Sequence, residues 1–409
     1  MPVSEIVRVA ARGDGVAADG RHAAYAAPGD TLTEAGEVVP GPHHQTPPCR
    51  HFQTCGGCRL QHLDDMAWDG FLRDRIASAL DAKGLQTEIR EPHLSPPRSR
   101  RRATLHAEVH GKAVTIGFVE AASNRIVDMR ECLILRPELF ALVQPLRLLL
   151  RWLSGRRRVD VTMTLADQGI DLLLSGMEAG GLTAEETLTD FARAHRLARL
   201  SLDSGYGPEV RWEPRPVTIT LGGVAVALPP AAFLQATVDG EAALIAGARE
   251  IVGDAQPVAD LFTGLGTFAL AIGGKVYAAE ASRDAALALK AVAPRIGGQL
   301  FVDHRDLFRR PLTPTEAGRF GAIILDPPRA GAEAQVRELA NAATGRIAYI
   351  SCNPGTFARD AAILVEGGWR LDWVRPIGQF RWSTHVELVA AFTRPDSPPS
   401  RNTGRPAAR

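Results

Sequence analysis

The stretch VADLFTGLGT, residues 258–267, decides the fold, because a short apolar run leads directly into a loop that holds two glycines. Residues 258–262 have the length and composition of a buried strand. Gly264 and Gly266 let the backbone turn sharply and approach a ligand without a Cβ in the way. The next predicted strand, residues 276–279, is closed by Glu280, a carboxylate placed to accept the hydroxyls of a ribose.

Strands and helices alternate outward from this stretch. Further strands are predicted at residues 300–302, 322–325 and 346–350, with helical patterns at 283–292 and 357–366. Such alternation is typical of a parallel, doubly wound sheet. Ala269 stands where the dinucleotide pattern needs a third glycine, so an adenosyl ligand without pyrophosphate, S-adenosylmethionine, is favoured. Asp306 follows the third strand and either lies beside the adenine or caps a helix.

Two motifs lie at the carboxyl-terminal rim of the predicted sheet, where ligands gather in such folds, and a third precedes a later strand. Cys352, in SCNPGT (351–356), follows the strand at 346–350, and DPPR (326–329) ends the preceding strand in a stiff loop that begins with Asp326. Glu387 closes FRWSTHVE (380–387) and starts a strand at 388–392, which suits proton transfer. A lone cysteine is more often a buried apolar residue, but its two neighbouring motifs favour a catalytic thiol.

The other four cysteines form a separate group. Cys49, Cys55 and Cys58 lie within ten residues, glycines separate the last two, and Cys132 is the available fourth thiol. This spacing predicts a bound metal centre. One Cys-x-x-Cys pair with a five-residue gap leaves both structural zinc and a cubane iron–sulfur cluster open.

Composition sets wider bounds. The 409 residues are 45% hydrophobic and 23% charged, with a net charge of +1, so any binding of nucleic acid must come from local patches. The stretch 98–102 is a candidate phosphate-contacting edge, whereas 156–158 is expected to be a solvated loop. No export signal and no membrane-length apolar run is present, which predicts a cytoplasmic protein, and we expect a monomer.

The predicted organisation has four parts and belongs to the α/β class. Residues 1–48 form a small, truncated β module, and residues 49–240 hold the cysteine-bearing segment and a central α+β domain. Residues 241–393 form the doubly wound, Rossmann-like domain. Residues 394–409 are rich in Pro, Ser and Arg and are predicted to be disordered.

Taken together, these motifs resemble those of the RNA (uracil-5-)-methyltransferase family, and within it the iron–sulfur enzymes that act on 23S rRNA. The resemblance covers residues 49–393, and its markers are CX5CGGC, DPPR, SCNP followed by Thr356, and HVE. It implies that Cys352 is the nucleophile, that Glu387 removes the C5 proton, and that Cys49, Cys55, Cys58 and Cys132 hold a [4Fe-4S] cluster. It also implies that the pocket for S-adenosylmethionine and uracil is lined by Gln235, Phe262, Thr267, Glu280, Asp306 and Asp326.

The sequence departs from the family pattern in a few places. Thr263 stands where many relatives have a cysteine, and Thr237 where an asparagine is common. The N-terminal module resembles the opening strands of the family's RNA-binding TRAM domain, but the closing strands are missing. By likeness the substrate is 23S rRNA, with tRNA as the alternative. An amino-methyltransferase and a non-enzymatic RNA-binding iron–sulfur protein are the rival classes.

Overall fold

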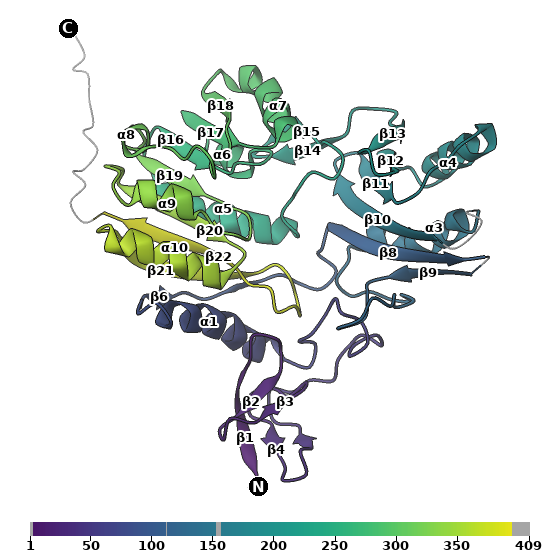
Figure 1. The fold of residues 1–409 in the computed structure, drawn as a ribbon, viewed down its shortest axis with the longest axis horizontal. Coiled ribbons are helices and arrows are strands. Elements are labelled where there is room, and N and C mark those ends of the chain that lie inside the picture. The colour runs from purple at the N-terminus through teal and green to yellow at the C-terminus, as the bar shows by residue number, and fades with distance from the viewer. Residues whose placement is uncertain (1–2, 112, 153–156, 395–409) are drawn as a thin grey trace.

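The computed structural model describes residues 3–111, 113–152 and 157–394. The predicted disordered tail therefore lies outside the described residues except for Arg394. Three larger β-sheets, a two-stranded hairpin and the helices that cover them make up the described part of the fold, with the N-terminal strands below, the largest sheet above them and a second sheet to one side (Figure 1). No helix in the described part combines the length and the apolar character that crossing a membrane requires.

The largest sheet has nine strands in the order β18-β17-β16-β19-β20-β22-β21-β6, with β7 also paired to β21. The five strands from β18 to β20 run parallel, and β22 is antiparallel to both of its neighbours. Crossovers leave β16 and β19 in opposite directions, which makes the gap between their carboxyl ends the switch point of a doubly wound sheet. These strands are β16 (Val258–Leu261), β17 (Val276–Glu280), β18 (Leu300–His304), β19 (Ala322–Leu325), β20 (Arg346–Ser351), β21 (Arg370–Gly378), β22 (Glu387–Thr393), β6 (Glu88–Ile89) and β7 (His93–Leu94).

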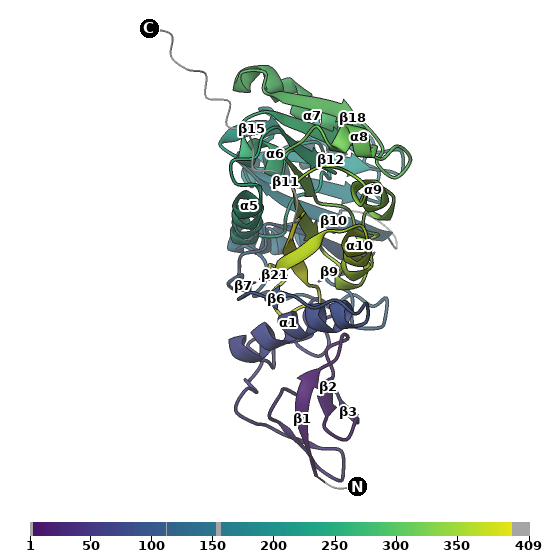
Figure 2. The same ribbon diagram turned by 90° about the vertical axis from the view of Figure 1, so that its left-hand side faces the viewer.

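Both faces of this sheet are buried, which explains the unbroken apolar runs of its strands. In β20, Ile347 and Tyr349 pack on one face, while Ala348 and Ile350 pack on the other. Helices α1, α9 and α10 cover the first face; α5, α6 and α7 cover the second, with α5 opposite α9 and α10 in Figure 2. The helices are α1 (Asp65–Asp81), α5 (Val238–Val252), α6 (Thr267–Ile272), α7 (Arg283–Val292), η1 (Ala293–Ile296), α8 (Pro314–Ala317), α9 (Glu333–Leu339) and α10 (Pro354–Glu366).

The central sheet has six strands in the order β13-β12-β11-β10-β8-β9 and is antiparallel except where β11 pairs with β12. Its apolar face packs against α2, α3 and α4. The elements are β8 (Arg102–His110), β9 (Ala113–Gly117), α2 (Pro137–Ala141), α3 (Val143–Leu150), β10 (Arg157–Ala166), β11 (Gly169–Ser175), α4 (Leu182–Ala194), β12 (Arg199–Asp203) and β13 (Glu209–Trp212). A separate hairpin, β14 (Thr218–Leu221) and β15 (Val224–Ala227), packs beside α7.

The N-terminal strands form a small antiparallel sheet in the order β3-β2-β1-β4-β5. They are β1 (Ser4–Val9), β2 (Gly15–Ala17), β3 (His22–Ala23), β4 (Thr31–Leu32) and β5 (Val38–Val39). The predicted fold class is therefore confirmed: a parallel Rossmann-like sheet near the C-terminus, a central α+β region and a small N-terminal β module. The domain boundaries stay predictions.

Candidate active site

The predicted nucleophile and base lie at the same rim of the largest sheet. Cys352 follows the last residue of β20, and Glu387 is the first residue of β22. These strands are antiparallel, and Ser351 pairs with Leu388, so the register brings Cys352 opposite Glu387. Asp326 follows β19, which is the other neighbour of β20, so all three side chains share one edge. The sheet thus assembles residues that are up to 61 positions apart in the sequence.

Burial raises the pKa of each titratable group in this cluster. The pKa of Glu387 rises to about 8, first through burial and then through the nearby Asp326 carboxylate. Burial and the neighbouring Asp260 raise the pKa of Asp326 to about 7. Burial raises the pKa of the Cys352 thiol to about 11, Glu387 and Asp326 add to this rise, and Arg329 opposes it. Such clustered shifts are typical of catalytic sites.

Gln235 joins this cluster from a distant part of the chain. It is buried just before α5, and its Nε2 lies 3.4 Å from Oδ2 of Asp326. Its other amide atom, Oε1, accepts a 2.7 Å hydrogen bond from Nε2 of Gln379. Gln379 is buried two residues after Ile377, which pairs with Glu387 across β21 and β22. The sequence analysis predicted that Gln235 lines the site but did not identify Gln379.

The glycine loop after β16 has the geometry of a ligand-binding turn. Phe262 has φ 63°, in the left-handed region that a non-glycine residue rarely adopts, which marks a strained position at the strand end. Gly264 and Gly266 have φ 58° and 92°, and a Cβ at Gly266 would lie 2.6 Å from the side chain of Leu289. The backbone conformation therefore requires both glycines, and packing against α7 also requires Gly266.

Glu280 is held beside this loop. Its Oε2 accepts a 2.8 Å hydrogen bond from the Gly264 N–H, and its Oε1 accepts one of 2.6 Å from the Ser282 N–H. Each carboxylate oxygen keeps a further acceptor position, which suits the two hydroxyls of a ribose. Thr267 begins α6 directly after the loop.

Asp306 lies on the neighbouring strand end. Its Oδ1 accepts a hydrogen bond of 2.9 Å from the Phe308 N–H, and residues 307–309 form a turn, so Asp306 does not cap a helix. The ring of Phe308 lies 5.4 Å from that of Phe262, so the ends of β16 and β18 meet here. A contact of Asp306 with adenine stays a prediction.

Asp260 offers a further signal that the sequence reading did not use. It is completely buried in β16, and its Oδ2 accepts hydrogen bonds from Thr263 Oγ1 at 2.5 Å and from the Ala269 N–H at 2.8 Å. Its Oδ1 has no hydrogen-bond partner among the described residues. A buried, unpaired carboxylate oxygen is costly, and it leaves an acceptor available to a ligand beside the glycine loop.

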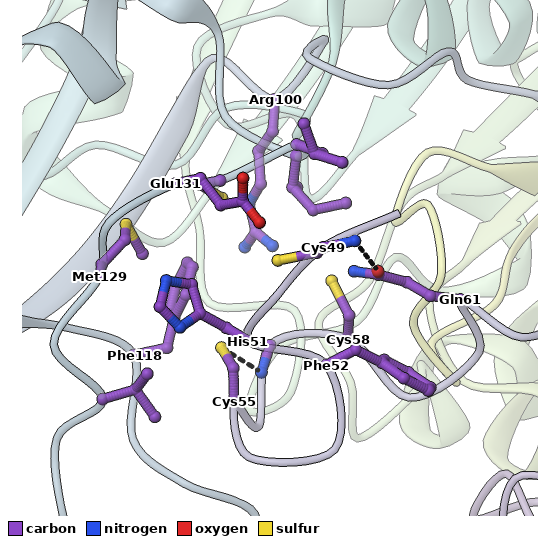
Figure 3. Close-up of a pocket in the computed structure, with 15 residues that line it drawn as sticks. Cys49, His51, Phe52, Cys55, Cys58, Gln61, Arg100, Phe118, Met129 and Glu131 are labelled. Atoms are coloured by element: carbon purple, nitrogen blue, oxygen red, sulfur yellow. Dashed lines mark hydrogen bonds between the residues drawn. The ribbon is translucent and has the colours of Figure 1, made fainter. Parts of the chain in front are cut away.

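The four cysteines outside the rim line a single pocket. Figure 3 shows the sulfur atoms of Cys49, Cys55 and Cys58 facing the same space, which Cys132 also lines. Burial raises the pKa of all four thiols, to about 12 for Cys58, and the nearby thiols add to the rise for Cys49, Cys55 and Cys58. Among the described residues, no three His, Cys, Asp or Glu side chains are arranged to hold a single metal ion.

The basic stretch 98–102, which the sequence suggested as a phosphate-contacting edge, is exposed at Arg98 but not along its whole length. Arg101 is buried, and its Nη2 lies 2.6 Å from Oε2 of Glu241. Arg100 lines the cysteine pocket (Figure 3). Its guanidinium lies 5.4 Å from the centre of the Phe380 ring. The side chains of the other stretch, 156–158, lie outside the described residues except for Arg158, which is exposed.

Comparisons with known proteins identify a matching family model, similar sequences and a similar solved structure. Residues 300–394 match the family model described as tRNA (Uracil-5-)-methyltransferase. An RNA methyltransferase of Zymomonas mobilis is 52% identical over 396 residues, covering 96% of this chain and 100% of the relative. The 23S rRNA (uracil(1939)-C(5))-methyltransferase of Photorhabdus laumondii is 30% identical over 374 residues, covering 86% and 83% of the two chains. The structure of Pyrococcus abyssi tRNA (uracil-54, C5)-methyltransferase with S-adenosyl-L-homocysteine superposes with a TM-score of 0.74 at 20% identity, covering 96% and 99% of the chains, and shows the same fold.

These relatives define a class of protein, the RNA methyltransferases, and the doubly wound sheet agrees with that class. Within that class, the chain belongs to the RNA (uracil-5-)-methyltransferase family. It is therefore an enzyme that methylates C5 of uracil in RNA.

Proposed function

We propose that this enzyme forms 5-methyluridine in 23S rRNA through a transient covalent bond between Cys352 Sγ and C6 of the uracil. The observation that carries the chemistry is the register that aligns Cys352 with Glu387 beside Asp326. The 30% identical relative that acts on 23S rRNA, matched over 83% of its length, supports the choice of RNA. We expect the enzyme to act as a monomer in the cytoplasm.

The residues at the rim suit each step of this reaction. Carbon 5 of uracil is a weak nucleophile, so the Cys352 thiolate first adds to C6 and pushes the electron pair of the C5–C6 double bond toward C5 and O4. Carbon 5 then takes a methyl group, which bound S-adenosylmethionine supplies as an electrophile. Glu387 accepts the C5 proton, and the released electron pair restores the double bond and expels the thiolate.

The raised pKa values indicate a second role for Asp326 and Glu387, which is to accept the proton of the Cys352 thiol. The pKa of the Cys352 thiol is about 11, so at neutral pH the thiol must pass its proton to a nearby base before it attacks. Asp326 and Glu387, whose pKa values are about 7 and 8, lie close enough to affect that thiol and are partly ionised near neutral pH. The target uridine must leave the RNA stack to reach the half-buried Cys352 thiol.

The residues at the ends of β16 to β18 suit the methyl donor. We infer that Glu280 binds the ribose and that Phe262 and Asp306 lie along the adenine. We infer that Gly264, Gly266 and Thr267 shape the loop beside the sulfonium end. The unpaired Oδ1 of Asp260 supports this assignment, because it faces no partner in the described chain and suits the cationic amino group of the donor.

The cysteine pocket suits a [4Fe-4S] cluster, and we propose that Cys49, Cys55, Cys58 and Cys132 hold it. Four thiols line one pocket. In a cubane, each cysteine binds a different iron, so the four thiols surround the cluster and do not converge on one atom. A structural zinc site would require that convergence.

Metal analysis tests this assignment. Protein purified without oxygen should contain about four iron and four sulfide per chain and absorb as an iron–sulfur protein. The Cys58→Ser variant should lose most of the iron, and Cys352→Ser should keep it. Stoichiometric zinc without sulfide would contradict the cluster.

Mass spectrometry of RNA tests the function. In a strain that lacks the gene, 5-methyluridine should disappear from one 23S rRNA fragment and return when the wild-type gene is supplied, but not with Cys352→Ala. Loss from tRNA alone would instead select the tRNA alternative, which the description of the matching family model favours. Unchanged 5-methyluridine in both RNAs would overturn the proposal.

A further inference from the structure

A buried chain of hydrogen bonds runs from the backbone into the active site. The N–H of Ala236 donates to Oε1 of Gln379 at 2.9 Å. Nε2 of Gln379 donates to Oε1 of Gln235 at 2.7 Å, and Nε2 of Gln235 points to Oδ2 of Asp326 at 3.4 Å. Two amides therefore stand in series between a fixed backbone group and the predicted catalytic rim.

The backbone sets the direction of this chain. Because the Ala236 N–H can only donate, the atom of Gln379 that meets it must be the oxygen, and the NH2 group of Gln379 must face Gln235. Gln235 then receives that bond through its own oxygen, so its NH2 group faces the site. The Gln235 NH2 group therefore presents a donor to the site, because its second hydrogen stays available beside the one directed at Asp326.

The two amides have little freedom to turn around. Gln379 is 2% exposed and Gln235 is 4% exposed. The first turn of α5 passes directly against Gln379, and a Cβ on Gly240 would lie 2.6 Å from the Gln379 Cβ. Gln379 also has a hydrogen-bonding interaction with Glu387 that partly offsets the rise in the pKa of that carboxyl. A flipped amide would leave buried donors and acceptors without partners.

The order of atoms in the pyrimidine ring identifies what this donor meets. Under the proposed function, on which this inference rests, Cys352 lies at C6 and Glu387 at C5, so groups beyond Glu387 face C4. Gln379 interacts with Glu387 and orients Gln235 there. C4 bears an oxygen acceptor in uracil and an amino donor in cytosine.

We propose that Gln379 is a positioning residue that makes the site selective for uracil over cytosine by orienting the amide of Gln235. With Gln379 in place, uracil O4 accepts from Gln235, whereas the amino group of cytosine opposes a second donor. Gln379 acts through Gln235 and is not itself a catalytic residue.

Trapping with 5-fluoropyrimidine RNA tests selectivity without the proton-removal step. Fluorine at C5 stops the reaction at the covalent adduct, so the rate of adduct formation can be compared for 5-fluorouridine and 5-fluorocytidine in one RNA fragment. The wild-type enzyme should prefer 5-fluorouridine. Gln379→Met should lower the ratio of the 5-fluorouridine rate to the 5-fluorocytidine rate about tenfold. This substitution conserves side-chain volume but removes the group that orients Gln235.

Gln335 offers a matched control. It is also a completely buried glutamine, its amide bonds to Leu312 at 2.8 and 3.1 Å, and it lies outside the site. Gln335→Met should be destabilised to a similar degree but keep the wild-type preference. If folded Gln379→Met and Gln335→Met prefer 5-fluorouridine over 5-fluorocytidine to the same degree, the proposal is overturned.

A second variant decides the matter if Gln379→Met does not fold. In Gln379→Glu, one carboxylate oxygen still accepts from Ala236, and the other accepts from Gln235, which turns the Gln235 oxygen toward the site. The preference for 5-fluorouridine should then fall below that of the wild type, and an unchanged preference would contradict the role. Failure of the wild-type enzyme to form any adduct would instead refute the proposed function.

Discussion

Glu387 illustrates how one residue joins function to stability. Its carboxyl is 5% exposed, and burial raises its pKa from the ordinary 4.5 to about 8. Between those two pH values the folded chain holds a proton that the unfolded chain has lost. The free energy of unfolding therefore decreases as pH rises through this window.

Replacing Glu387 with glutamine should remove this decrease in the free energy of unfolding. At pH 7 the variant should gain about 3 kcal/mol in free energy of unfolding, and below pH 4.5 it should match the wild type, because both side chains are then neutral. Methyl transfer should be lost at every pH. Melting temperatures measured at pH 4 and pH 8 check this, and a variant that melts below the wild type at pH 8 would contradict it.

Some site residues could be predicted from their residue type, whereas others were identified only from the geometry of the structure. Cys352 and Glu387 were identified from sequence because a lone thiol and a carboxylate at strand ends are chemically unusual. Gln379 was not, because a glutamine in an apolar segment has no distinctive sequence signal. Its role depends on hydrogen bonds to Gln235 and Ala236, which are 144 and 143 positions away.

At the scale of elements, the segment before Glu387 rests on the cysteine-bearing segment. The Trp382 carbonyl accepts hydrogen bonds from the N–H groups of Arg59 and Leu60, at 2.8 and 3.0 Å. Arg59 directly follows Cys58. The loop 380–386 therefore connects the cysteine pocket to the start of β22.

This contact predicts that loss of the cysteine centre loosens the catalytic loop. In Cys58→Ser, the amides of residues 380–390 should exchange with deuterium about tenfold faster, because the hydrogen bonds to Trp382 lose their support. Cys352→Ser is the control, since it removes a thiol without changing this contact. Exchange rates that match the control, measured by mass spectrometry, would show that the two segments are independent.

The elements were predictable to different degrees. The buried parallel strands β16, β19 and β20 were found almost to the residue, because strands covered on both faces are continuous apolar runs. β21 was missed, because RLDWVRPIG mixes charges with Pro376. In the structure Pro376 falls between the stretches that pair with β6 and β7, where the ladder is interrupted.

For the whole molecule, the N-terminal module is part of a larger core. Val9 and Ala27 belong to the same apolar cluster as Trp68 and Leu72 of α1. His44 Nδ1 also lies 2.7 Å from the buried carboxylate of Asp30. The sequence predicts a small β module that ends near residue 48, and its packing connects it to the methyltransferase sheet through α1.

Deletion of residues 1–39 should therefore destabilise the remaining chain. The truncated protein should melt several degrees lower, because the apolar surface of α1 loses the cover of Val9 and Ala27. Thermal denaturation followed by circular dichroism provides the measurement. An unchanged melting temperature would show that the module is an independent appendage.

The central claim is the covalent bond between Cys352 and the uracil ring. Incubation of the enzyme with S-adenosylmethionine and 23S rRNA containing 5-fluorouridine, followed by nuclease and protease digestion, yields peptides for mass spectrometry. The account predicts one nucleotide-modified peptide that contains Cys352, and none from Cys352→Ser. Efficient methylation of ordinary uridine by the Cys352→Ser enzyme, without any adduct in the wild type, would contradict it.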